Sequence, residues 1–174
     1  VCNGVVFGQF EQIRELIVRT GRGGLSEVGR GVKRLSEQLG ETSYAMHVKG
    51  LEMPGYEPRS LKALGMNYAL SNMGATHCYG YCQQEIGNPK PRLVDAAADE
   101  GKGDIVKYNQ DYVAAVELVN ACTFPAHNLE FFGLELIGQM LVAAVGESKY
   151  GSADYLWHVG EKVYNLERCF NIRD

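Results

Sequence analysis

The sequence has no long apolar run and no strong charge of either sign. No stretch of about 18 apolar residues occurs, so no transmembrane helix is predicted. The formal net charge is −4 and the pI about 5.6, which gives no indication of binding to nucleic acid or to an anionic membrane. The first residues, VCNGVVFGQFEQ, lack the charged start, apolar middle and cleavage site of a secretory signal, and there is no initiator Met. We therefore expect a cytoplasmic protein that is part of something longer.

The number and spacing of the cysteines do not favour a secreted disulfide scaffold. The chain has five Cys residues, an odd number at irregular intervals, which favours free thiols or metal ligands. His77, Cys78 and Cys82 could begin a zinc site. However, no second closely spaced ligand pair follows them, because His127 and Cys169 stand alone. Buried free thiols are the favoured interpretation of Cys78 and Cys82.

The spacing of apolar residues is typical of helices. Leu25, Val28, Val32, Leu35 and Leu39 predict one helix that Gly40 ends. Prolines make 47–59 irregular, and no Asn-Gly hairpin signal occurs. Other helices are expected around Phe10 to Ile17 and over 61–71, 104–121 and 129–145, the last of these buried. A final helix, capped by Ser152 or Asp154, should bury Leu156, Val159, Val163, Leu166 and Phe170. The predicted fold class is all-α, an irregular multi-helix bundle with long loops that contain Pro and Gly.

Four stretches carry a resemblance to one enzyme family. They read HVKGLEMPGYEPR (His47 to Arg59), NYALSNMGATH (Asn67 to His77), ELVNACTF (Glu117 to Phe124) and EKVYNLERCFNIRD at the end of the chain. In order and spacing they resemble the patterns KG-x-E-x-P-x-YDPR, SN-R-GACH, D-x-x-GLC and ERIYNLERLFN of the tungsten-containing aldehyde ferredoxin oxidoreductases. The resemblance runs from about Arg22 to Asp174 and implies the C-terminal helical part of such an enzyme.

The resemblance implies roles for particular residues. Cys122 matches the Cys that is the fourth ligand of a [4Fe–4S] cluster, where thiolates serve as soft anionic donors. His77 matches a His beside the metal that orients or protonates the aldehyde. Glu117 and Asn120 lie in the motif that contacts the pterin. From the residues alone, Cys122 also fits a buried residue at a helix end, His77 a structural His, and Glu117 a solvated helix residue.

The implied enzyme oxidises aldehydes to carboxylic acids at a tungsten (or molybdenum) bis-pterin and passes electrons through a [4Fe–4S] cluster to ferredoxin. Residues 1–60 would be the end of a middle helical domain and 61–174 a C-terminal helical domain. The cofactor-binding N-terminal part and three cluster cysteines are missing from this sequence, so we expect the chain alone to be inactive and to bind no cofactor. The expected partners are that N-terminal part, ferredoxin and the aldehyde, and a homo-oligomer is compatible with the sequence.

Among the positions at which these motifs depart from the family pattern, four bear on the implied cofactor site. Met73 replaces Arg, Glu117 replaces Asp, Asn120 replaces Gly and Ala121 replaces Leu. These changes motivate an alternative of a different class. In that alternative, the chain is a helical structural or subunit-interaction module that has kept the fold and lost the cofactor site.

Overall fold

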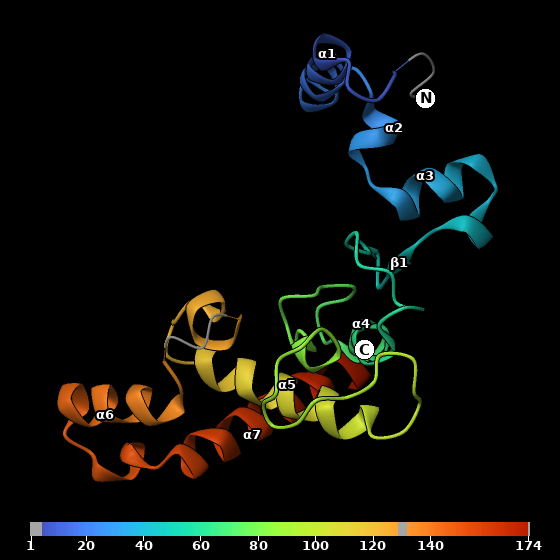
Figure 1. The fold of residues 1–174 in the computed structure, drawn as a ribbon. Coiled ribbons are helices and arrows are strands. Elements are labelled where there is room, and N and C mark those ends of the chain that lie inside the picture. Colours follow the sequence, from blue (N-terminus) through green and yellow to red (C-terminus); the bar gives the residue numbers. More distant parts are fainter. Residues whose placement is uncertain (1–4, 129–131, 174) are drawn as a thin grey trace. The chain divides into compact units, whose positions relative to one another are not determined.

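The computed structural model describes residues 5–128 and 132–173 and is predominantly helical (Figure 1). The helices are α1 (Phe10–Gly21), α2 (Ser26–Gly29), α3 (Val32–Leu39), α4 (Lys62–Leu70), α5 (Lys102–Glu117), α6 (Leu134–Val145) and α7 (Ala153–Arg173). Shorter helical turns are η1 (Thr42–Tyr44), η2 (Gln83–Glu85), the π-helix η3 (Phe124–Asn128) and η4 (Ser148–Gly151). The predicted all-α class is confirmed, since the only strands within the described ranges are β1 (His47–Val48) and β2 (Leu51–Glu52). The chain divides into two compact units, Val1–Met53 and Pro54–Asp174.

In the first unit, the single helix predicted over 25–39 is wrong, because α2 and α3 are separate helices. Gly31 divides them with a φ of +86°, a conformation that L side chains rarely adopt. Directly after it, the Val32 N–H donates to Glu52 Oε1 at 2.7 Å, so a carboxylate from β2 caps the start of α3. This bond is the main reason why the pKa of Glu52 is lowered. The predicted end of α3 at Gly40 is confirmed by its left-handed conformation.

A short hairpin joins β1 to β2, although the sequence has no Asn-Gly turn. His47 pairs with Glu52 and Val48 with Leu51 in antiparallel register. The two residues between the strands, Lys49 and Gly50, have φ values of 54° and 85°. A two-residue turn with positive φ at both positions matches the right-handed twist of the strands. Lys49 therefore adopts a backbone conformation that is uncommon for residues other than glycine.

The second unit is built around α5, which packs against α4, α6 and α7. In Figure 1, α7 lies along α5. Three buried clusters surround the central helix: Ile105 and Val106 with Ala63 and Cys82; Val113 and Ala114 with Tyr79 and Tyr164; Ala115 and Val116 with Leu134, Ile137 and Leu156. Because α5 contributes to all three clusters, it is the central element of this unit.

The start of α7 is confirmed, and its predicted buried face is confirmed only in part, since Leu156 is buried, Val159 and Val163 are half-buried, and Leu166 and Phe170 are exposed. Ser152 Oγ accepts the Tyr155 N–H at 3.2 Å and caps the helix. The buried residues are Leu156, Gly160 and Tyr164, whereas Leu166 and Phe170 are 70% and 66% exposed. The face that meets α5 is set by close approach at Gly160, where an added Cβ would lie 2.2 Å from the Asp111 carbonyl oxygen.

Helix α6 also differs from its prediction. It begins at Leu134, and the predicted start at Leu129 lies outside the described residues. The helix is not buried around its circumference. Leu134, Ile137 and Gly138 face the core, and Leu136, Met140 and Val145 are exposed. Apolar composition alone therefore predicted more burial than this unit provides.

A buried ion pair joins the start of α4 to the start of α5. Lys102 Nζ lies 2.5 Å from Glu85 Oε1, and their side chains are 6% and 0% exposed. Glu85 also accepts the N–H groups of Ala63 at 2.8 Å and Leu64 at 3.1 Å. One carboxylate thus neutralises a buried ammonium and satisfies two backbone donors at the first turn of α4.

Candidate functional site

His77 lies in the long loop between α4 and η2, against two tyrosine rings. Its ring centroid is 5.0 Å from that of Tyr56 and 5.8 Å from that of Tyr81. The two tyrosine rings are themselves 5.6 Å apart. Cys78 Sγ lies 3.4 Å from His77 Nε2. The imidazole is half-buried, held by aromatic contacts and beside a thiol, so it remains accessible from one side.

The two cysteines of the HCYGYC segment lie in different environments. Cys82 is buried against α4 and α5, and burial is the first cause that raises its pKa to about 12. Cys78 is exposed, so the prediction of a buried thiol is right for Cys82 and wrong for Cys78. Over the described ranges, no group of three or more His, Cys, Asp or Glu side chains could hold a metal ion. This result gives no support to a zinc site at this segment.

The C-terminal turn of α5 explains why Asn can stand at position 120, where the family pattern has Gly. The helix was predicted to reach Ala121, but it ends at Glu117. Asn120 has a φ of 55°, and its N–H donates to the Glu117 carbonyl at 2.9 Å. The Ala121 N–H donates to the Val116 carbonyl at 3.3 Å. This pair of bonds is a Schellman motif, whose left-handed position favours Gly and tolerates Asn better than most other residues.

Glu117 and the loop that carries His77 share a neighbour on α7. Glu167 Oε2 accepts the Tyr79 hydroxyl at 2.7 Å and the Asn72 amide at 3.1 Å. Desolvation, followed by repulsion from Glu167, raises the pKa of Glu117 although the residue is exposed overall. The structure thus brings Glu117 near the Asn72 to Tyr79 segment. Among the described residues, no hydrogen bond or ring contact joins His77 to Glu117, Asn120 or Cys122.

Cys122 is exposed immediately after the helix end. The Schellman turn leads the chain away from the α5 axis, so the thiol is not part of the core behind it. An exposed thiol at this position is chemically suited to be one donor of an iron–sulfur cluster. A complete cluster needs four donors, and the described residues offer no such group.

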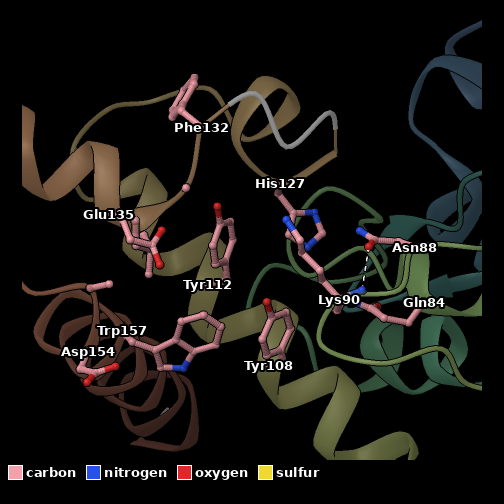
Figure 2. A pocket seen from close by; sticks show the side chains of 13 residues that line it. Gln84, Asn88, Lys90, Tyr108, Tyr112, His127, Phe132, Glu135, Asp154 and Trp157 are labelled. Carbon is pink, nitrogen blue, oxygen red and sulfur yellow. Dashed lines mark hydrogen bonds between the residues drawn. The ribbon is translucent and has the colours of Figure 1, made fainter.

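A cavity of about 400 Å³ in the second unit was not predicted from the sequence. Figure 2 shows Tyr108 and Tyr112 from α5 beside Trp157 from α7, with Glu135 and Asp154 on one side and Lys90 and His127 on the other. The ring of Trp157 lies 4.7 Å from that of Tyr108 and 5.7 Å from that of Tyr112, measured between centroids. The signal available in the sequence is the spacing of the two tyrosines, which places them on one face of a helix.

His127 is buried at the edge of this cavity by a polar network. Its Nε2 lies 2.7 Å from Asn109 Oδ1. Asn109 Nδ2 donates to the Ile105 carbonyl at 2.7 Å and to Gln84 Oε1 at 2.9 Å, which fixes the amide orientation. Nε2 therefore carries the hydrogen in this bond, because the atom it faces is an acceptor. The sequence showed His127 only as an isolated residue.

Among the helices that the structure describes, each is too short or too polar to span a membrane.

Residues 3–174 match the family model described as aldehyde ferredoxin oxidoreductase, domains 2 and 3. The chain is 32% identical over 163 residues to the tungsten-containing aldehyde ferredoxin oxidoreductase of Pyrococcus abyssi, covering 92% of this chain and 26% of that protein. The corresponding protein of Thermococcus kodakarensis is 31% identical over 149 residues, which are 84% of this chain and 24% of that protein. The chain thus spans about a quarter of the length of these relatives. By the match of nearly all its residues, this chain belongs to the aldehyde ferredoxin oxidoreductase family.

Proposed function

We propose that the chain is the helical part of an oxidoreductase that oxidises aldehydes to carboxylic acids. The family match over 3–174 carries this proposal. In the complete protein, a tungsten (or molybdenum) bis-pterin would supply the two-electron chemistry and a [4Fe–4S] cluster would pass electrons to ferredoxin. This chain would supply one cluster ligand and residues that position the substrate and the pterin.

The proposed cluster ligand is Cys122, supported by its exposure and by its place after the Schellman turn. Glu117 is proposed to accept hydrogen bonds from the pterin, and its carboxylate is already partly desolvated. Asn120 is proposed to present backbone to the same ligand, because it is exposed and its left-handed φ of 55° places it in the turn after α5. His77 is proposed to hold a proton near the aldehyde oxygen, as a half-buried imidazole can.

The proposed partner of this chain is the cofactor-binding N-terminal part of the same protein. The relatives are about four times as long as this chain, which leaves room for that part. A groove lined by Met73, Leu166 and Phe170 is open, and these three side chains are 60%, 70% and 66% exposed. Apolar side chains that gather at one surface are typical of interfaces. Ferredoxin and the aldehyde are the further partners proposed for the complete enzyme.

Replacing Cys122 with Ala in the complete protein should remove or destabilise the iron–sulfur cluster, because one iron loses its soft anionic donor. Iron content and the visible absorbance of the cluster measure this effect. The matched control is Cys169→Ala, another exposed thiol, for which normal iron content is expected. Cys78→Ala and Cys82→Ala should also retain the cluster. The 174-residue chain alone is expected to bind no cluster and to oxidise no aldehyde.

A normal cluster in Cys122→Ala, together with its loss in Cys78→Ala or Cys82→Ala, would place the metal site at the HCYGYC segment instead. A normal cluster in all four variants would contradict the assignment of Cys122. A complete protein that binds no cluster would favour the structural or subunit-interaction module. In that case the departures at Met73, Glu117, Asn120 and Ala121 would mark a lost cofactor site.

Replacing His77 with Asn in the complete protein is expected to lower kcat by about 100-fold or more, the usual contribution of a positioned acid or base. Metal content should stay unchanged, because the proposed role involves a proton and not a ligand. The control is His158→Asn, an exposed His on α7 with side-chain exposure of 59%, which should leave kcat unchanged. Equal activity of the His77 variant and the control would contradict the proposed role.

A further inference from the structure

We propose that the cavity between α5, α6 and α7 is an accessory binding site for a small organic cation of the trimethylammonium type. The cavity has a volume of about 400 Å³, within the range of small-molecule sites. Its lining residues belong to the second unit alone and include none of the residues proposed to serve the cofactor. This inference therefore stands on different residues and does not depend on the proposed oxidoreductase activity.

The aromatic wall is the first observation that points to a cation. Tyr108 and Tyr112 lie one turn apart on α5 with nearly parallel rings, 6.5 Å between centroids and 12° between planes. Trp157 packs against both from α7. The wall is held in place, since the Tyr112 hydroxyl donates to the Ala126 carbonyl at 3.3 Å. Aromatic faces attract cations through the negative potential above the ring, and indole does so most strongly.

Two carboxylates at one side of the cavity are the second observation. Glu135 lies in the first turn of α6 and Asp154 in the first turn of α7. Within the part of the chain that the structure describes, neither side chain has an ion-pair partner. Lys90 and His127 line the opposite side (Figure 2). The cationic group of a ligand should therefore lie at the Glu135 and Asp154 side of the cavity.

A metal ion fits this cavity poorly. Hard cations such as Ca²⁺ require six or more oxygen ligands, and the described residues provide no group of three or more metal-binding side chains. Aromatic rings do not replace these ligands. A methylated ammonium is weakly hydrated and gains from contact with the ring faces, so the combination of three rings and two carboxylates favours an organic cation.

Choline and its uncharged carbon isostere, 3,3-dimethylbutan-1-ol, test this proposal on the unmodified 174-residue chain. Trp157 is the only Trp of the sequence and lies in the cavity wall, so its fluorescence reports binding directly. At constant ionic strength, choline should give a saturable change and the isostere should bind roughly tenfold more weakly or not at all. The absence of a saturable change with choline, or equal binding of the isostere, would overturn the proposal.

A double variant, Glu135→Gln with Asp154→Asn, tests the carboxylates. It should raise the Kd for choline roughly tenfold, because the charge is lost while size is kept. The matched control is Asp104→Asn, which removes an exposed carboxylate from the first turn of α5 outside the cavity. The control should bind choline normally. Circular dichroism verifies that the variants fold, and unchanged affinity in the folded double variant would refute the assignment of the charged side.

Discussion

Replacing Gly160 with Ala should lower the free energy of unfolding of the second unit by about 3 kcal/mol, at the upper end of the usual cost of overpacking. An ideal Cβ at this position would lie 2.2 Å from the Asp111 carbonyl oxygen and 2.9 Å from Ala115 Cβ. Both obstacles belong to α5, so the two helices must move apart. Urea unfolding, followed through Trp157 one turn away on α7, measures the loss.

The control for this substitution is Gly103→Ala at the start of α5, where nothing lies within 4 Å of the added Cβ. Ala has the higher helix propensity, so this variant should be stabilised by up to about 1 kcal/mol. The two variants should change the free energy of unfolding in opposite directions. This difference distinguishes the effect of helix propensity from that of the close contact between α5 and α7. Stabilisation of the Gly160 variant would show that α5 and α7 are too far apart for an added Cβ to meet the Asp111 carbonyl oxygen.

Replacing Glu85 with Gln should destabilise the second unit by about 3–5 kcal/mol, as measured by the same urea titration. The substitution leaves the buried ammonium of Lys102 without its counter-charge and turns an amide group toward the N–H donors of Ala63 and Leu64. Since domains of this size have only about 5–15 kcal/mol of stability, a large part of it would be lost.

The matched control is Glu57→Gln, which breaks an exposed ion pair with Arg59 at 2.6 Å. Solvent and salt screen that pair, so little change in stability is expected. A second comparison is Lys102→Met combined with Glu85→Gln, which removes the uncompensated charge and should recover part of the loss. If Glu85→Gln unfolds at the same urea concentration as the unchanged chain, the proposed role of the buried pair is wrong.

The close contact at Gly160 and the ion pair between Lys102 and Glu85 affect the candidate site as well as the stability of the unit. Both hold α5, which carries Tyr108 and Tyr112 in its middle and Cys122 just beyond its end. We expect a displacement of α5 away from α7 to separate Tyr108 and Tyr112 from Trp157, which packs against both. We therefore expect the Gly160 variant to lose choline binding at denaturant concentrations where it is still folded.

The helical class, several helix ends and the family could all be predicted from the amino-acid sequence. Gly40 and Ser152 act locally, through a left-handed conformation and a hydroxyl acceptor, so their roles needed no tertiary information. The family motifs could likewise be identified from residue identity and order alone. Asn120 was recognised as a departure from Gly, but the Schellman turn that explains it requires the hydrogen bonds of the folded chain.

The buried faces of the helices and the contacts between distant residues could be found only in the folded chain. The apolar stripe of α7 predicted burial of Leu166 and Phe170, yet the helix turns Gly160 and Tyr164 toward α5 because backbone approach is closest there. One continuous apolar pattern became α2 and α3 because Glu52, twenty residues away, bonds the Val32 N–H. The cavity joins residues from α5, α6 and α7 with others from η2, η3 and the connecting loops. Such contacts depend on distances between segments, and the periodicity of each segment alone holds no information about them.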